Sequence, residues 1–196
     1  MLLRPSILLP LLLLALRLPL SASAWQADVY QGYWGPRNFD DGYGFGLAIG
    51  HETRAGAMTS LRLAIYPQFD RTVATSTEPV DLELQVLPLE LTYMIPLVPP
   101  GYVFRSYLGG GIGYFFTSLK SKGPAGEITT SVDDHFGWLA GGGLNLHVTD
   151  SFALFGEMFF RGIAGRFRDG SLTSPTFTRE LDFSGLSFQF GMRLSW

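Results

Sequence analysis

The residues of this chain best suited to catalysis or metal binding lie together in one polar stretch. Asp133, Asp134 and His135 are consecutive, and Ser131 lies just before them. Carboxylate and imidazole groups can bind zinc, and an Asp–His pair can polarise a serine hydroxyl. Adjacent residues in so polar a stretch are, however, more typical of a solvated turn. We therefore expect no catalytic residue, no metal site and no cofactor.

The glycine-rich run 109–113 is a second candidate motif. A phosphate-binding loop requires a Lys and then a Ser or Thr after its glycines, with a helix beginning there. Neither feature follows this run. Glycine instead recurs at alternate positions, where it would make room for larger neighbours inside a narrow barrel. The positions are Gly44, Gly46, Gly109, Gly111, Gly113, Gly141 and Gly143.

Charged residues form the third candidate group, because they recur opposite the apolar positions of strand-like segments. Three carboxylates and four guanidinium groups in one interior would either pair into a packed polar core or line a gated conductance pathway. Which of these two arrangements applies depends on the width of the barrel formed by the strands that carry the charged residues. The residues are Glu52, Arg62, Glu90, Arg105, Glu157, Arg161 and Arg193.

The clearest of these elements is the C-terminal segment 183–196, where large apolar residues alternate with small or polar ones. Period-two alternation predicts a β-strand with one apolar and one polar face. The apolar face contains no small residue, which favours lipid on that side and a polar lumen on the other. Its members are Leu186, Phe188, Phe190, Met192, Leu194 and Trp196.

Seven similar segments precede this one, at 26–34, 43–52, 60–66, 81–95, 102–116, 136–148 and 152–161. Short turns are predicted at 53–56, 96–101 and 149–151, and long loops at 35–41, 69–79, 117–134 and 165–182. This alternation is the plan of an outer-membrane barrel, with the short turns and both chain ends in the periplasm. Beside Pro88 the apolar phase changes, which predicts a β-bulge.

The first 24 residues predict a secretory signal peptide. Arg4 supplies the positive region, residues 7–16 the apolar core, and Ala22-Ser23-Ala24 the cleavage site. Prolines and Arg17 interrupt the apolar run, so a transmembrane anchor is not favoured. The chain has no cysteine, which excludes a lipoprotein signal and disulfides.

Cleavage after Ala24 would leave 172 residues (196 − 24), enough for one domain. It would also remove two arginines, leaving 12 basic residues (14 − 2) against 17 acidic ones and a net charge of −5. That balance argues against nucleic acid as a partner.

A soluble lipocalin-like barrel or β-sandwich would also have regular strands. With charges on the opposite faces, it would have to expose its aromatic faces to water, well beyond a normal surface patch. A chain without a membrane helix can span a bilayer only as a closed barrel. We therefore predict an all-β protein, an eight-stranded antiparallel up-and-down transmembrane β-barrel over residues 25–196. So narrow a lumen favours the paired core over the conductance pathway.

The chain after the signal resembles the OmpA/OmpX-like family of small outer-membrane barrels over essentially its whole length. Two stretches carry the resemblance most clearly. One is Phe136-Gly137-Trp138 with Gly141-Gly142-Gly143-Leu144, Thr149-Asp150 and Glu157; the other is Tyr102 with the 109–114 run. The C-terminal strand is similar to the β-signal of Gram-negative outer-membrane barrels, which usually ends in Phe where this chain has Trp196. The resemblance implies the barrel and insertion by the barrel assembly machinery. No peptidoglycan-binding domain follows Trp196, so that family function is not implied.

These features together predict an integral outer-membrane protein, a monomer surrounded by membrane lipid and lipopolysaccharide, with a structural or surface-interaction role through its long loops. A narrow channel is the second hypothesis. A lipid A-modifying enzyme is the third, but the sixth and seventh strands lack the lipid-facing His–Ser pair of lipid A deacylases. We therefore expect no enzymatic activity.

Overall fold

The computed structural model describes residues 24–37, 40–74, 79–123, 126–131, 135–168 and 178–196. The predicted signal peptide, 1–24, lies outside these ranges apart from Ala24. The described residues form strands β1 (Ala24–Pro36), β2 (Gly42–Glu52), β3 (Met58–Ala74), β4 (Pro79–Pro96), β5 (Phe104–Gly123), β6 (Gly126–Ser131), β7 (His135–His147), β8 (Phe152–Arg168), β9 (Thr178–Asp182) and β10 (Gly185–Ser195). Within them, no helix is long and apolar enough to cross a membrane.

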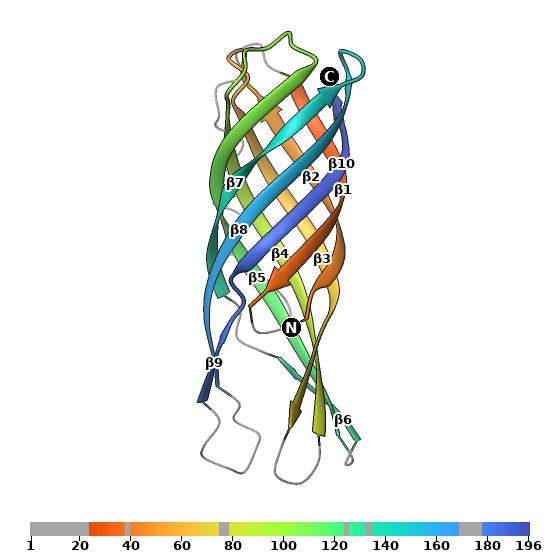
Figure 1. Ribbon diagram of the computed structural model, residues 1–196, viewed down its shortest axis with the longest axis vertical. Coiled ribbons are helices and arrows are strands. Elements are labelled where there is room, and N and C mark those ends of the chain that lie inside the picture. The colour runs from red at the N-terminus through yellow and green to blue at the C-terminus, as the bar shows by residue number, and fades with distance from the viewer. Residues whose placement is uncertain (1–23, 38–39, 75–78, 124–125, 132–134, 169–177) are drawn as a thin grey trace, which may run out of the picture.

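Eight of these strands close into an antiparallel barrel, which confirms the predicted fold class. Their order around the barrel is β10, β1, β2, β3, β4, β5, β7 and β8, and pairing of β8 with β10 completes the ring. The seam between the first and last strands is long, running from Gln26 opposite Ser195 to Pro36 opposite Gly185. Figure 1 shows the strands tilted against the long axis, as closure of a barrel requires.

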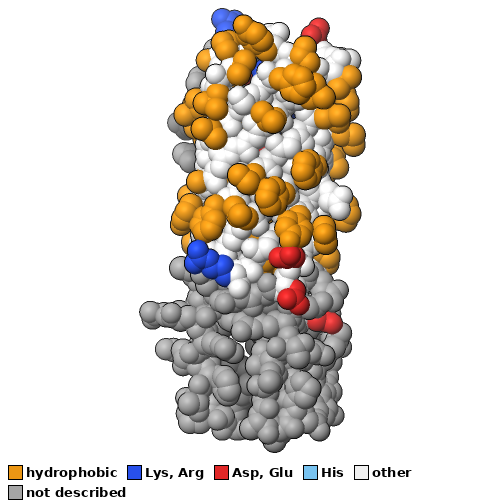
Figure 2. All heavy atoms as spheres, viewed as in Figure 1, with side chains coloured by type: hydrophobic (Ala, Val, Ile, Leu, Met, Phe, Trp, Pro, Cys, Tyr) orange, Lys and Arg blue, Asp and Glu red, His pale blue; other side chains and the backbone are white. Residues whose placement is uncertain are grey.

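Along the strands, apolar side chains alternate outward and polar ones inward, the reverse of the arrangement in a soluble protein. Outward side chains are large, apolar and exposed, as for Phe45 at 68% and Phe190 at 67%. Inward side chains include buried charges, as for Arg161 at 0% and Glu90 at 1%. Figure 2 shows hydrophobic side chains spread over the described barrel wall, with charged side chains towards its two ends. A continuous apolar outer wall of this kind requires a hydrocarbon environment.

Short turns join the strands at one end, as predicted. In the first, the N–H of Gly56 donates to the carbonyl of Thr53 at 2.8 Å, and Gly56 has a φ of 84° that other residues rarely adopt. The N–H of Val148 donates to the carbonyl of Phe152 at 2.9 Å in the third turn. Trp25 and Trp196 exchange two backbone hydrogen bonds of 3.0 Å at this same end.

Where the structure describes them, the predicted long loops at 69–79, 117–134 and 165–182 are strand, so this part of the prediction was wrong. β3 continues to Ala74 and β4 begins at Pro79, β5 continues to Gly123 and pairs with β6, and β8 continues to Arg168 and pairs with β9. β1 similarly extends into the predicted 35–41 loop, to Pro36. These extensions pass beyond the lipid, so neither face needs to be apolar. The alternation that marks a membrane strand is therefore missing there.

The predicted bulge beside Pro88 was also wrong. β4 pairs with β5 in unbroken register through Pro88 opposite Phe115, and its inward positions keep one phase from Leu84 to Met94. The register shift lies instead on the neighbouring strand β3, between Tyr66 and Phe69. The apparent phase change in β4 arises because its inward residues change from apolar Leu84 and Val86 to charged Glu90.

Candidate functional site in the lumen

The structure places all seven predicted lumen residues on the inner face of the barrel and joins them in ion pairs. Five are buried, whereas Glu52 and Arg105 are only partly buried at the short-turn end. Three of the pairs join strands that are not neighbours in the sheet, so they cross the lumen, whereas Arg193 and Glu157 lie on the neighbouring strands β10 and β8. Their members are Glu52 with Arg105, Arg62 and Arg193 with Glu157, and Glu90 with Arg161.

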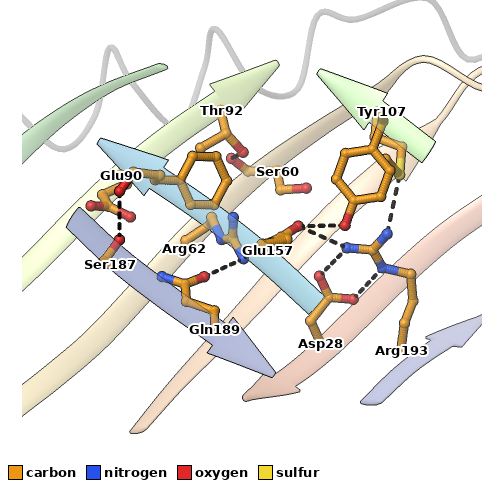
Figure 3. Close-up of polar contacts among 12 residues, drawn as sticks. Asp28, Ser60, Arg62, Glu90, Thr92, Tyr107, Glu157, Ser187, Gln189 and Arg193 are labelled. Atoms are coloured by element: carbon orange, nitrogen blue, oxygen red, sulfur yellow. Dashed lines mark hydrogen bonds and ion pairs between the residues drawn. The ribbon is translucent and has the colours of Figure 1, made fainter. Parts of the chain in front are cut away.

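Glu157 on β8 lies at the centre of this network, as Figure 3 shows. Its carboxylate accepts a hydrogen bond from the guanidinium of Arg62, across the lumen on β3, and another from the Tyr107 hydroxyl at 2.8 Å. Arg62 also donates to the side-chain oxygen of Gln189 at 2.8 Å. Arg193 approaches the same carboxylate to 3.9 Å. Several donors therefore hold one buried anion in place.

Arg193 has its main partner in Asp28, a residue that was missing from the predicted set. The guanidinium of Arg193 donates to both carboxylate oxygens of Asp28 at 2.8 Å, in a bidentate pair, and to the side-chain oxygen of Asn145 at 3.2 Å. Asp28 and Arg193 are directly opposite each other in β1 and β10. This ion pair therefore bridges the seam that closes the barrel. Alternation with the outward Val29 could have placed Asp28 inside.

Arg161 and Glu90 form the next layer toward the long-hairpin end. Arg161 donates from Nε and Nη2 to the two oxygens of Glu90 at 2.7 and 3.1 Å, and its guanidinium lies 5.4 Å from the centre of the Trp34 ring. Both ionic side chains are at most 2% exposed. This pair marks the boundary where the lumen changes from ionic to aromatic.

An aromatic plug fills the lumen beyond this layer. Trp34 packs edge-on against Tyr66 and Phe69, with ring centres 5.5 and 5.4 Å apart, and it also faces Phe115 at 6.0 Å. All four side chains are at most 1% exposed. Leu84, Val86, Ile163 and Phe183 belong to the same buried cluster. The sequence analysis did not predict this continuous apolar layer.

Inward glycines allow this packing, in two different ways. At Gly46 an added Cβ would collide with the ring of Tyr30, so this glycine seats an aromatic side chain. At Gly141 it would collide with the backbone carbonyl of Met158, so here the strands themselves approach too closely for any side chain. Gly109 and Gly111 meet neighbouring backbone carbonyls in the same way.

The predicted insertion-signal residues lie on the outer face of the last strand. Phe190, Met192, Leu194 and Trp196 are exposed, and Phe188 is partly exposed. Of the Asp-Asp-His motif, Asp133 and Asp134 lie outside the described residues, whereas His135 begins β7 and is buried. In the described part of the chain, no three His, Asp or Glu side chains are placed to hold a metal ion. The lumen is thus arranged for ion pairing and packing.

The sequence matches no protein-family model and no curated protein. Its fold, however, is similar to several solved barrels. The outer membrane protein OprG from Pseudomonas aeruginosa has a TM-score of 0.65 at 12% identity, over 89% of this chain and 96% of that chain. A major outer membrane protein from Thermus thermophilus has a TM-score of 0.61 at 13% identity, over 89% and 100%. Outer Membrane Protein W from E. coli has a TM-score of 0.57 at 14% identity, over 91% and 100%.

At these identities the similarity concerns the fold, and it confirms the resemblance to the small OmpA/OmpX-like barrels at that level. The exposed apolar wall independently requires a membrane around the barrel. Together, the apolar wall and the shared fold identify this chain as an integral outer-membrane β-barrel protein.

Proposed function

We propose that this protein acts at the cell surface, where strands that extend past the barrel bind an extended segment of another protein. The observation that carries the proposal is a sheet made by four consecutive strands. Pairing continues to Ala74 opposite Pro79 in β3–β4, to Asp81 opposite Lys122 in β4–β5, and to Gly123 opposite Gly126 in β5–β6. Figure 1 shows these extensions at the end away from the short turns.

The outer edge of β6 is the proposed contact. Among the described residues β6 pairs only with β5, so one row of its backbone N–H and C=O groups has no strand beside it. Natural edge strands are commonly protected by lysine, proline or a bulge. β6 contains one charged residue, Glu127, followed by the β-branched Ile128, Thr129 and Thr130. Such an edge is suited to the addition of a strand from a partner.

The filled lumen argues against the channel as the leading hypothesis. A conducting path would have to pass the Arg161–Glu90 pair and then the plug around Trp34, and these side chains are almost fully buried. An eight-stranded barrel has little interior space beyond that of its own side chains. The extended strands therefore offer a better working surface than the lumen.

Photo-crosslinking on intact cells tests this proposal. A photoreactive residue at Thr130 should give a discrete adduct with a surface or extracellular protein. Successive residues of a strand point their N–H groups to opposite edges, so of Ile128→Pro and Thr129→Pro one removes a donor from the free edge. That variant should lose the adduct, whereas Thr129→Ala should keep it. An adduct that persists in both proline variants would exclude pairing at this edge.

The third hypothesis, a lipid A-modifying enzyme, has a separate test. We expect lipid A from cells with and without the protein to give the same mass spectrum. A difference of one acyl chain between the two samples would replace the interaction proposal with an enzymatic one.

A further inference from the structure

The mouth of the barrel at the short-turn end contains an open pocket of about 510 Å³ that is lined in part by charged side chains. This is the volume of a small-molecule site. The pocket is separate from the β6 edge, which lies at the other end of the barrel. Its walls include the Glu52–Arg105 ion pair and His147, and its rim includes Arg54 and Asp150.

Charges of both signs line this pocket, and those at the rim are held apart. Arg54 lies in the turn between β2 and β3, whereas Asp150 lies in the turn between β7 and β8. Strands β4 and β5 separate the two turns on one side of the barrel, and β10 and β1 on the other. Neither rim residue makes an ion pair with another described residue. Each is therefore free to bind an oppositely charged group.

The pocket wall offers further polar capacity. Arg105 uses Nη1 for Glu52 at 2.9 Å, but its buried Nε has no hydrogen-bond partner among the described residues. The buried Nε2 of His147 is also without one. Both atoms lie behind the pocket surface, so a ligand would meet the accessible groups of the partly buried Arg105 and His147, which are polar and favour a polar ligand.

We propose that this pocket binds a small zwitterion, such as a short peptide with a free ammonium and a free carboxylate. The carboxylate would pair with Arg54 and the ammonium with Asp150. A simple anion would meet the two acids, and a simple cation the two arginines. Only a ligand with both charges matches both sides. Two sources have this chemistry: free peptides and the peptide stems of the cell-wall polymer.

Calorimetric titration of the barrel purified from outer membranes in detergent tests the proposal, with alanyl-alanine as the probe. Saturable binding is expected, and either Arg54→Ala or Asp150→Ala should weaken it by about tenfold, the value of one charge-assisted contact. N-acetylation or C-terminal amidation of the dipeptide should weaken binding similarly. Asp40→Ala, an exposed change outside the pocket, is the matched control and should leave the affinity unchanged.

Two results would overturn the proposal: no saturable binding at millimolar dipeptide, or equal binding of the blocked and free dipeptides. Both rim residues are exposed, and retention of the folded, heat-modifiable band in gel electrophoresis shows that each variant remains a barrel. A soluble cell-wall fragment with a peptide stem distinguishes the sources. Tighter binding than the dipeptide indicates the polymer, and equal binding indicates free peptides. Because proline changes in β6 leave this pocket intact, failure here is independent of failure of the surface-interaction proposal.

Discussion

Glu157 is the residue on which the interior charges depend most. Its carboxylate accepts hydrogen bonds from Arg62 and Tyr107 and forms a longer ion pair with Arg193. Sequence alternation placed Glu157 on the inner face but left its partner open among Arg105, Arg161 and Arg193. The principal partner is Arg62, 95 positions away in sequence. Because the ion pair is buried, replacing one of its two members should destabilise the protein far more than replacing both.

Glu157→Ala should lower the free energy of unfolding in detergent by about 3–5 kcal/mol, because it leaves the buried Arg62 guanidinium without its carboxylate partner. Glu127→Ala, in strand β6 of the long-hairpin end, is the control and should have little effect. Replacing both members of the pair, as Arg62→Met with Glu157→Leu, should recover much of the loss. Urea denaturation of the three variants measures these differences. Equal tolerance of Glu157→Ala and Glu127→Ala would mean a wet, open lumen and would favour the channel.

Two glycines of the barrel wall should respond differently to substitution, because one lies against a neighbouring backbone and the other has space beside it. Gly141→Ala should be destabilising by at least about 1–3 kcal/mol, since the new Cβ would meet the backbone of β8 and the strands would have to move. Gly156→Ala should be nearly neutral, because its Cβ would meet only the ring of Phe190 at 3.3 Å on the lipid side. Unfolding in detergent compares them. Similar destabilisation by both would contradict the distinction between the two positions.

The last strand, β10, has a different role on each of its two faces. Its inner face contributes Gln189 and Arg193 to the ion-pair network, whereas its outer face contributes exposed apolar side chains. Barrel closure uses the backbone of this strand on both edges, with β1 and with β8. A change on its outer face alone should therefore affect assembly without disturbing the lumen.

Deletion of Trp196, or Phe190→Asp, should reduce the amount of protein inserted in the outer membrane if this strand is read by the assembly machinery. An Asp on the lipid face has a modest cost by itself, below the roughly 2–4 kcal/mol of Lys or Arg at the midplane. Phe45→Asp is the matched control, because Phe45 is equally exposed on β2. Immunoblots of outer-membrane fractions measure the yield. If Phe45→Asp and Phe190→Asp reduce it equally, the effect is one of lipid exposure and not of a signal.

The whole molecule is a closed barrel with a stratified interior. Ion pairs occupy the half near the short turns, where they pack against aromatic rings such as Phe155 and Phe159, and the half near the long hairpins is filled by aromatic and aliphatic side chains. Both layers obstruct the axis, but they do so through different forces. Ion pairs can exchange partners, whereas the plug around Trp34 is held by packing.

We expect no steady, ion-selective conductance from the purified protein in planar bilayers. The combined change Trp34→Ala, Phe69→Ala and Phe115→Ala should remove the plug yet leave the ion pairs, and conductance should remain low. Removing the ion-paired layers as well, with Glu90→Ala, Arg161→Ala, Arg62→Ala and Glu157→Ala, should raise it. Steady conductance from the unaltered protein would instead make the channel the leading function.

The sequence by itself determined the architecture and the direction of most side chains. Period-two alternation repeats over strands that cross lipid, so the inner and outer faces of β2, β5 and β10 could be assigned one residue at a time. It also identified seven of the lumen charges, including Glu90 and Arg161, because a charge opposite a lipid-facing residue must be inside.

Tertiary structure alone decided which residues meet. Alternation specifies a face but not a register or a partner across the lumen, so the pairing of Arg62 with Glu157 depended on the closure of the barrel. The plug was hidden because the apolar Leu84 and Val86 look like outward residues of β4, and Phe69 faces inward only because of the register shift in β3. The hairpin extensions were hidden for a related reason. Outside the bilayer both faces of a strand meet water, and the alternation on which the prediction relied is not required there.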